Sequence, residues 1–453
     1  MKFVDREKEL KVLEEAVRDK KAMVILYGRR RIGKTALVKR FIEDRDDALY
    51  LYVPIQSEGA MLRYLAETLY RQTKNPLLKS AFPSFREFME YLVSLGKIVV
   101  IDEFQRLEKV EGAISIMQDV WDSSDSLKLV LTGSSIGMIH SLALSGNAPL
   151  FGRRTLDMKL GPFSPEIVFS LAGDVAAGME LYSVFGGTPA YIGRIQWNRT
   201  ALWNAERLIL RKGAPLYSEP EYLIRSETRD PSTYLAVLRY ISAGKQAVGE
   251  IGDMLAMERN KVSFYLSVLE KEMDLIKKET PVTEDSKKSR RGRYRIVDPY
   301  FRFWFRYVFP YRSELEVERV EDVLQIVKRD MESNAGRVAE EVVRRYAGMG
   351  YQKVGSWWNR KGEEIDIVAL NEKRKEILFG EVKWRNRPVG WDVVEELMEK
   401  KELVNWHNGE RKERFLVVSK SGFTKKCIER MDEQGVMHWD AGEVERRIIG
   451  GLS

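Results

Sequence analysis

The residues whose types and spacing most directly predict chemistry stand in one stretch, G-R-R-R-I-G-K-T, over residues 28–35. Its two glycines, Gly28 and Gly33, let backbone N–H groups curl around phosphate oxygens. Lys34 can reach the β- and γ-phosphates, and the hydroxyl of Thr35 can bind Mg²⁺. The stretch therefore predicts a site for ATP and Mg²⁺, and the residues between the glycines complete the loop: Arg29, Arg30, Arg31 and Ile32.

The sequence around this loop has the strand and helix that phosphate binding requires. Residues 24–27, V-I-L-Y, form an apolar run that predicts a buried strand, and residues 36–43 carry the pattern of an amphipathic helix. The positive N-terminus of that helix adds to the attraction for phosphate. Residues 3–17 predict a further helix that leads into the strand. A glycine turn that matched by chance would lack this context, so we interpret the loop as a nucleotide site.

A second short strand is expected at residues 49–53, and an acidic pair lies at the end of the next buried strand, in K-I-V-V-I-D-E-F-Q. Asp102 is placed to hold Mg²⁺ through its water shell, and Glu103 is placed to orient and polarise the attacking water. Another apolar run ends in T-G-S-S, where one of Thr132, Ser134 and Ser135 could sense the γ-phosphate. The alternative is that these hydroxyls only cap the next helix.

Two arginines and a proline complete the nucleotide-binding candidates. Arg153 and Arg154, in F-G-R-R-T, could stabilise charge in the transition state, or they could equally bind a neighbouring carboxylate. Residues 164–196 are helical in pattern but are interrupted by F-G-G-T-P-A-Y-I. Pro189 and the glycines before it predict a rigid turn, and this segment is a candidate lid over the nucleotide.

The middle of the chain combines three short helical patterns with a basic segment. Helices are expected over residues 233–243, 247–257 and 260–273, followed by two strands on either side of K-K-S-R-R-G-R-Y-R. This order predicts a winged helix-turn-helix with a basic wing. The candidate DNA contacts are Arg259, Asn260 and Lys261 on the recognition helix and Arg290, Arg291 and Arg293 on the wing. The alternative is a winged helix that only packs inside the protein.

An aromatic segment follows, Y-F-R-F-W-F-R-Y-V-F-P-Y at residues 300–311. Base stacking is conceivable, but such density favours a buried seam between domains. Arg302 and Arg306 interrupt the segment too strongly for it to span a membrane.

A second constellation, D…E-x-K, lies near the C-terminus. Asp366 is expected in one strand and Glu381 with Lys383 in the next, where the alternation of side chains directs Glu381 and Lys383 to one face. Asp366, Glu381 and the carbonyl of Val382 would form a hard oxygen site for Mg²⁺, and Lys383 would position or deprotonate the water that attacks a phosphodiester. Glu340, on a preceding helix, is a candidate ligand of a second metal.

These motifs together resemble a known family. F-V-D-R-E-K-E-L, G-R-R-R-I-G-K-T, I-D-E-F-Q, L-T-G-S-S, F-G-R-R and G-G-T-P-A-Y look like the archaeal ATPases, which are P-loop proteins of the AAA+/STAND type. The resemblance implies that Arg153 or Arg154 is an arginine finger and that the turn at Pro189 lies near the adenine. The C-terminal order of motifs is similar to PD-(D/E)XK nucleases, although Ile365 replaces their usual proline. It also resembles the uncharacterised domain that accompanies the archaeal ATPase domain.

Length and composition limit the number of domains, the kinds of partner and the kinds of metal site that can be expected. The 453 residues exceed what one hydrophobic core supports, and the net charge of +7 permits a nucleic-acid partner without requiring one. One cysteine and three histidines exclude a Cys-rich zinc site and favour oxygen-ligated metal. The charged N-terminal residues and the lack of a long apolar run predict a cytoplasmic protein without a membrane partner. DNA is the expected partner, and a homo-oligomer is left open.

We therefore expect a multidomain α/β protein with four parts. They are a P-loop ATPase core at 1–160, a helical lid at 161–230, a winged helix-turn-helix at 231–312, and a restriction-endonuclease-like domain at 313–453. The first functional hypothesis is an ATPase coupled to DNA binding and Mg²⁺-dependent DNA cleavage. The alternative is a STAND-like switch, in which ATP controls conformation or assembly and the last domain binds nucleic acid or a partner without cutting. A DNA-binding module without enzymatic activity is disfavoured by the motifs at both ends.

Overall fold

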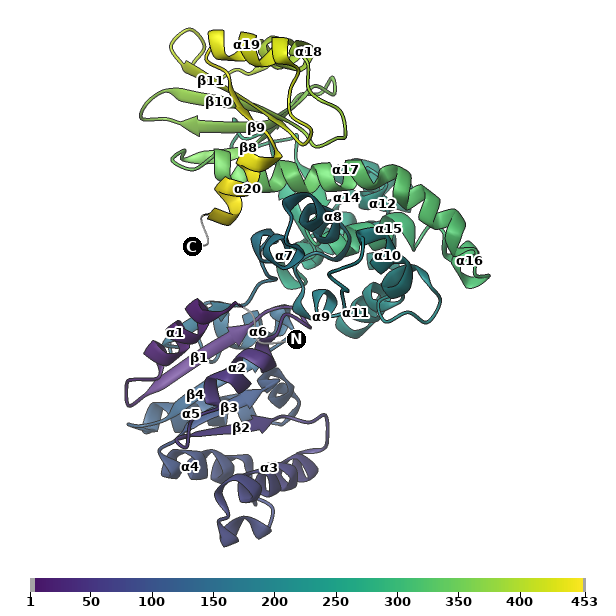
Figure 1. Cartoon of the computed structure of the whole chain (residues 1–453). Helices are drawn as coiled ribbons and strands as arrows, with labels where there is room; N and C mark the ends of the chain where they lie inside the picture. The colour runs from purple at the N-terminus through teal and green to yellow at the C-terminus, as the bar shows by residue number, and fades with distance from the viewer. Residues whose placement is uncertain (1–4, 451–453) are drawn as a thin grey trace. The chain divides into compact units, whose positions relative to one another are not determined.

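The computed structural model describes residues 5–450 and divides the chain into two compact units (Figure 1). Unit 1 comprises the chain up to Pro162 together with residues 271–273, and unit 2 comprises the rest. The helix expected over residues 3–17 is observed as α1, Glu7–Ala16, and its first two expected residues lie outside the described part. The finer division into four domains stays a prediction.

Unit 1 is a parallel five-stranded sheet in the order β2-β3-β4-β1-β5. Its strands are β1 Ala22–Tyr27, β2 Ala48–Tyr52, β3 Ile98–Asp102, β4 Lys128–Gly133 and β5 Leu156–Lys159. Its helices after α1 are α2 Lys34–Ile42, α3 Glu58–Thr73, α4 Phe85–Leu95, α5 Ala113–Ser123 and α6 Ile136–Ile139, with shorter turns at Pro76–Lys79, Phe104–Lys109 and His140–Leu144.

Both faces of this sheet are buried, which explains its nearly continuous apolar strands. Met23 and Ile25 of β1 face the cluster that contains residues of α3, α4 and α5, whereas Val24 and Leu26 face the cluster that contains residues of α1 and α2. Because all five strands are parallel, their carboxyl ends lie at one edge, where ligands of such sheets bind. The phosphate loop, Asp102 and Thr132 all stand at that edge.

Unit 2 begins with helices. These are α7 Pro165–Ala172, α8 Val175–Phe185, α9 Pro189–Ile192, α10 Ala201–Ala205, α11 Glu219–Glu227, α12 Pro231–Ser242, α13 Val248–Leu255 and α14 Arg259–Ser267, with π-helical turns at Glu206–Leu210 and Val268–Glu272. The turn before α9 requires its glycine, because a Cβ on Gly187 would lie 1.9 Å from the carbonyl oxygen of Phe163. An antiparallel ribbon, β6 Ile276–Glu279 and β7 Arg293–Ile296, follows α14. The expected order of three helices and a two-stranded ribbon is therefore present, while its assignment as a winged helix stays a prediction.

The aromatic segment forms α15, Pro299–Tyr307, before α16, Arg312–Glu316, and the long α17, Val320–Ala347. The six aromatic side chains within α15 are all buried: Tyr300, Phe301, Phe303, Trp304, Phe305 and Tyr307. The expected burial is confirmed, and buried rings of this kind cannot stack on bases, while a position at a seam between domains stays a prediction.

A second sheet closes unit 2, in the order β12-β11-β10-β9-β8. Its strands are β8 Lys353–Trp358, β9 Glu364–Asn371, β10 Glu376–Lys383, β11 Lys412–Ser419 and β12 Met437–Trp439. The pairs β8–β9 and β9–β10 are antiparallel, and the pairs β10–β11 and β11–β12 are parallel. The core on one face contains residues of α17 and of α20, Ala441–Ile449. The core on the other contains residues of α18, Trp391–Lys400, and α19, Lys425–Glu433, with a short turn at Lys401–Leu403 between them in the chain.

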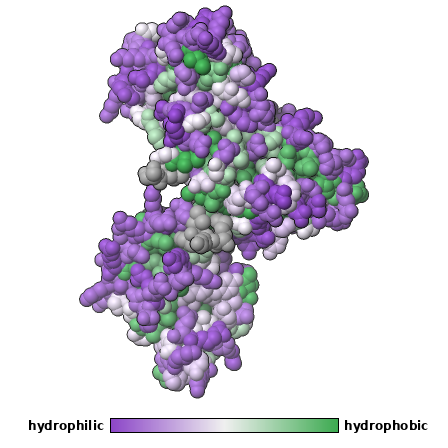
Figure 2. Space-filling model, in the orientation of Figure 1, coloured by the Kyte–Doolittle hydropathy of each residue, from purple (hydrophilic) through white to green (hydrophobic). Residues whose placement is uncertain are grey.

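Among residues 5–450, no helix is both long and apolar enough to span a membrane. Hydrophilic residues cover most of the face seen in Figure 2, and hydrophobic residues are scattered among them.

Candidate nucleotide and metal sites

The phosphate loop has the backbone that its glycines predict. Gly28 and Gly33 have φ values of 155° and 96°, and a Cβ on Gly28 would lie 2.3 Å from the carbonyl oxygen of Leu160. The helix α2 begins directly after Gly33, so its unpaired N–H groups face the loop. The ammonium of Lys34 donates hydrogen bonds of 2.8 and 2.9 Å to the carbonyls of Gly28 and Arg29. Lys34 thus lies across the loop, where the predicted phosphates would accept hydrogen bonds from its ammonium group.

Asp102 gathers the hydroxyl groups around the expected Mg²⁺ position. Its carboxylate is 2% exposed and accepts hydrogen bonds from Thr35 at 2.8 Å, from Tyr50 at 2.7 Å, and from Thr132. Burial and the bond to Asp102 raise the pKa of Tyr50, which keeps its hydroxyl protonated. The structure brings Thr35 and Asp102 together as expected, whereas Tyr50 was missed. The only signal for Tyr50 was its position on a strand next to the one that carries Asp102.

Glu103 is held in an uncommon backbone conformation at the end of β3. Its φ of 61° lies in the left-handed region, which is a strained state for a glutamate. Its Oε2 accepts hydrogen bonds from Ser134 at 3.0 Å and from Gln105 at 2.8 Å, and Arg106 lies 3.6 Å away. These side chains fix the carboxylate that is expected to orient water.

The helix-capping interpretation of Thr132 is wrong. Its hydroxyl donates to Asp102, and the residue that precedes α6 is Ser135, whose side chain makes no capping hydrogen bond. The role of Thr132 as a γ-phosphate sensor stays a prediction.

Arg153 and Arg154 each bind a neighbouring carboxylate within unit 1. Arg153 makes a bidentate pair with Asp122, at 2.8 and 2.7 Å, which lowers the pKa of Asp122. Arg154 donates to Asp157 at 2.9 Å and to the carbonyl of Ala143 at 2.8 Å. The carboxylate alternative is therefore observed for both arginines, and their action in ATP hydrolysis stays a prediction. Pro189 is the first residue of α9 in unit 2, and its role near the nucleotide also stays a prediction.

The expected DNA contacts separate into exposed and paired groups. Arg259, Asn260 and Lys261 are exposed and form the first turn of α14. Arg290 is exposed as well.

The wing arginines nearer β7 are engaged within unit 2. Arg291 binds Glu284 and donates to the carbonyl of Trp358 at 2.6 Å. Arg293 pairs with Glu364 at 3.3 Å. Part of the charge of the basic segment is thus neutralised inside the protein, and DNA contact by Arg291 and Arg293 stays a prediction.

The D…E-x-K residues meet on two antiparallel strands. The register that pairs Ile367 with Gly380 brings Asp366 opposite Glu381 at the next step. Asp366 Oδ2 accepts a hydrogen bond of 2.9 Å from the N–H of Val382, and Lys383 Nζ lies 2.5 Å from Glu381 Oε1. The other carboxylate oxygen, Glu381 Oε2, is buried and has no hydrogen-bond partner in the described chain.

The electrostatics of this site fit a divalent cation. Burial, followed by the charges of Glu381 and Glu340, raises the pKa of Asp366 well above its usual range. Burial also raises the pKa of Glu340. A cation between Asp366 and Glu381 would relieve their repulsion and occupy the orphaned oxygen, and Mg²⁺ commonly takes one or two carboxylates together with waters.

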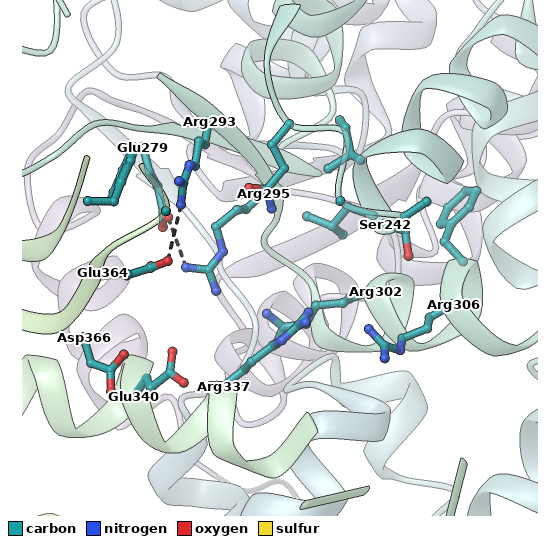
Figure 3. Close-up of a pocket in the computed structure, with 18 of the residues that line it drawn as sticks. Ser242, Glu279, Arg293, Arg295, Arg302, Arg306, Arg337, Glu340, Glu364 and Asp366 are labelled. Atoms are coloured by element: carbon teal, nitrogen blue, oxygen red, sulfur yellow. Dashed lines mark hydrogen bonds and ion pairs between the residues drawn. The ribbon is translucent and has the colours of Figure 1, made fainter. Parts of the chain in front are cut away.

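The second metal site expected at Glu340 is not preformed. Within residues 5–450, no three acidic, histidine or cysteine side chains converge closely enough to hold a metal. Glu340 nevertheless lines the same cavity as Asp366 and Glu381, a hollow of about 960 Å³ (Figure 3). Its role as a ligand of a second metal stays a prediction.

Comparison with known proteins adds two family matches. Residues 3–195 match the family described as an ATPase domain predominantly from Archaea, and residues 304–402 match the family described as Archaea bacterial proteins of unknown function. An uncharacterized protein of Methanocaldococcus jannaschii is 34% identical over 407 residues, which cover 85% of this chain and 88% of that protein.

Two further similarities are more limited. An uncharacterized ATP-binding protein of Methanocaldococcus jannaschii is 52% identical over 44 residues, or 10% of this chain and 75% of that protein. The Walker-type ATPase of Pyrococcus abyssi has a similar fold, with a TM-score of 0.51 and 23% identity over 67% of this chain and 96% of that one.

Proposed function

This chain belongs to the archaeal ATPase family that joins an ATPase domain to a C-terminal domain of unknown function, and from this premise we propose that it couples ATP hydrolysis to DNA binding and Mg²⁺-dependent DNA cleavage. The chain is an ATPase. We propose which process the ATP hydrolysis drives and which residues carry out the hydrolysis.

In the ATP site, Lys34 and the backbone of the phosphate loop would bind the β- and γ-phosphates. Thr35 and Asp102 would hold the accompanying Mg²⁺, because their oxygens already lie 2.8 Å apart at the end of the sheet. Bound Mg²⁺ would neutralise charge that develops on the phosphates. Glu103 would orient the attacking water, since it is the next residue after Asp102 and its carboxylate is fixed by Ser134 and Gln105.

The DNA-cleavage half of the proposal is carried by one observation. Glu381 Oε2 is buried without a partner beside Asp366, whose pKa its charge raises, in a cavity large enough for substrate. If the two strands had only a structural role, the repulsion between the Asp366 and Glu381 carboxylates would destabilise the fold without any benefit. The residues fit an Mg²⁺ ion that would polarise a phosphodiester, with Lys383 placed to position the attacking water. In the same proposal, a winged helix spanning α12–α14 and β6–β7 presents Arg259, Asn260 and Lys261 to DNA.

The test is metal-dependent cleavage of DNA. Purified protein with Mg²⁺ should cut single-stranded, duplex or branched DNA, and EDTA should stop the reaction. Asp366→Ala, Glu381→Ala and Lys383→Ala should each lose cleavage while ATP hydrolysis survives, because the ATP site has its own Mg²⁺ ligands. Glu402→Ala is a matched control, since Glu402 lies in the same part of unit 2 with a side chain 72% exposed. Identical cutting by the wild type and the three site variants would identify a contaminant and remove the nuclease assignment.

A second function is favoured by the restraint on Glu103. Ser134 and Arg106 join the Glu103 carboxylate to neighbouring segments of unit 1, so a nucleotide bound beside Glu103 would act on those segments as well. In this second function, bound ATP controls conformation or assembly and the C-terminal domain binds without cutting. Absence of cleavage on every DNA form, together with an ATP-dependent change of sedimentation or protease sensitivity, would favour this switch.

A further inference from the structure

The cavity that contains Asp366 also has a wall of arginines, and the proposed metal site gives these arginines no role. Arg302 and Arg306 stand four positions apart on α15, and Arg295 and Arg337 come from β7 and α17. Figure 3 shows these side chains directed into the hollow, with Asp366 and Glu340 at its other end. The aromatic rings of α15 face the core, whereas Arg302 and Arg306 on the same helix line the cavity.

Most of this wall is held by carboxylates behind it. Arg302 Nη1 and Arg295 Nη2 share Glu341 Oε1, at 3.1 and 3.2 Å. Arg306 pairs with Asp330 at 3.0 Å. These ion pairs fix the guanidinium groups in place, and such pre-organisation reduces the entropy that a ligand would have to overcome.

Two arginines of this wall keep N–H groups that no described residue accepts. Arg302 Nη2 is buried and has no hydrogen-bond partner in the part of the chain that the structure describes. Arg337 makes no hydrogen bond or ion pair with any residue between 5 and 450. Burial, followed by the neighbouring charges of Arg302, Arg306 and Arg295, lowers the pKa of Arg337, while the charge of Glu340 acts in the opposite direction. A partly buried guanidinium with three like charges around it is stabilised by an added anion, and a phosphate, which accepts two parallel N–H bonds, is the anion that guanidinium geometry matches best.

The phosphate position and the carboxylate site lie within one hollow. Arg337 and Glu340 are three residues apart on α17 and therefore lie on the same helix face. The cavity measures about 960 Å³, and pockets of roughly 300 to 1,000 Å³ enclose single drug-sized molecules. Since a nucleotide is of that size, the hollow has room for roughly one or two nucleotides of a single strand and none for a continuous duplex.

We propose that Arg302, Arg306 and Arg337 form a phosphate subsite that holds the backbone of a single nucleic-acid strand beside Asp366 and Glu381. This inference rests on the proposed DNA-processing function and narrows its substrate class to a separated strand, such as a free end or a flap. The adjacent phosphodiester of the same strand lies against the carboxylates, and the duplex part of a substrate stays outside the cavity.

The test compares binding of a short single strand of about six nucleotides, which lies within the site sizes of single-strand binding proteins, with binding of a duplex of the same sequence. Fluorescence anisotropy in EDTA measures affinity without metal-dependent cleavage. Arg337→Gln should weaken single-strand binding by about tenfold to a hundredfold, because it removes a charge-assisted contact. It should also reduce the salt dependence of log K by about 0.7 per lost phosphate contact.

Three further proteins make the result specific. Lys328→Gln removes one charge from an exposed position of α17 outside the cavity and should leave single-strand affinity unchanged. Arg337→Lys should bind with an affinity between those of the wild type and Arg337→Gln, because it keeps the charge but loses the fork of donors. Arg259→Gln with Lys261→Gln should weaken duplex binding and spare the short single strand.

The outcomes separate the subsite from the proposed function. Single-strand binding that is equal in the wild type and Arg337→Gln, with duplex binding that depends on α14, overturns the subsite and leaves DNA binding standing. Equal loss of single-strand and duplex affinity in Arg337→Gln overturns the assignment to one strand. If the wild type binds neither form of nucleic acid, both the subsite and the DNA-processing function fall.

Discussion

The hydroxyl of Ser134 donates a hydrogen bond of 3.0 Å to the carboxylate of Glu103. Ser134 follows the end of β4, whereas Glu103 follows β3, so the contact joins the carboxyl ends of two neighbouring strands. Together with the bond from Gln105, it fixes the carboxylate of Glu103, whose backbone has a left-handed conformation with a φ of 61°. The position of the expected water-orienting carboxylate therefore depends on polar residues outside the acidic pair.

Lys34 and Glu103 should separate ATP binding from ATP turnover. Lys34→Ala should abolish detectable binding of ATP, because the ammonium meets the phosphates. Glu103→Gln should bind ATP with nearly wild-type affinity but should lower kcat by about 10² to 10⁴, the usual contribution of a positioned proton acceptor. Equilibrium binding of a labelled nucleotide and steady-state phosphate release measure the two effects. Normal hydrolysis by Glu103→Gln would remove Glu103 from this role.

Ser134 should affect turnover more than binding. Ser134→Ala removes a hydrogen bond to a charged acceptor, and such bonds are worth about 1.5 to 3 kcal/mol, so a misplaced Glu103 should lower kcat by tenfold or more while the dissociation constant for ATP changes little. Ser135→Ala is the control, because the adjacent Ser135 makes no side-chain capping bond. A fall in ATP affinity in place of kcat would show that Ser134 contacts the nucleotide and does not position Glu103.

The parts of the fold that were predictable are those in which local pattern and chemistry agree. The apolar run before Gly28 had to be a buried strand, and glycine was required because Leu160 approaches to 2.3 Å of a Cβ at that position. The strand patterns predicted Asp366 on one strand and Glu381 on the next, and the bond from the N–H of Val382 to Asp366 at 2.9 Å agrees with that placement.

The parts that were not predictable depend on contacts between distant residues. A run of basic residues does not reveal that Arg291 binds Glu284 and the carbonyl of Trp358, because a salt bridge depends on the tertiary fold. In the sequence, Arg302 and Arg306 are likewise visible only as charges that interrupt an aromatic segment. Their common direction into the cavity follows only from the packing of α15.

The exposed residues of α14 and the paired arginine of the wing should behave differently. Arg259→Gln with Lys261→Gln should weaken duplex binding and flatten its salt dependence by up to about 0.9 for each lost phosphate contact. Arg291→Gln should instead lower the free energy of unfolding by about 1 kcal/mol, because Glu284 and the carbonyl of Trp358 lose a donor. Titrations at several salt concentrations and urea unfolding distinguish the two classes. A salt slope that changes with Arg291→Gln alone would return Arg291 to the DNA surface.

Asp366 should reduce the stability of the metal-free protein at neutral pH. Burial and the charges of Glu381 and Glu340 raise its pKa in the folded state above the value of about 3.9 for an unfolded chain. Below that value both states are protonated and the residue has no effect on folding. As the pH rises through it, the unfolded chain loses its proton first, so the folded state becomes progressively less stable until the raised pKa is passed.

Asp366→Asn removes this titration, and it should therefore be more stable than the wild type at neutral pH in EDTA. The difference should shrink as the pH falls below about 4. Without nucleotide, Mg²⁺ should raise the unfolding temperature of the wild type by mass action and should act less on Asp366→Asn, which has lost a ligand. Thermal unfolding of both proteins from pH 4 to 8, with EDTA or Mg²⁺, measures both effects. A metal-free wild type that is more stable than Asp366→Asn at neutral pH would show that Asp366 is a satisfied structural carboxylate and that the pair was not arranged around a cation.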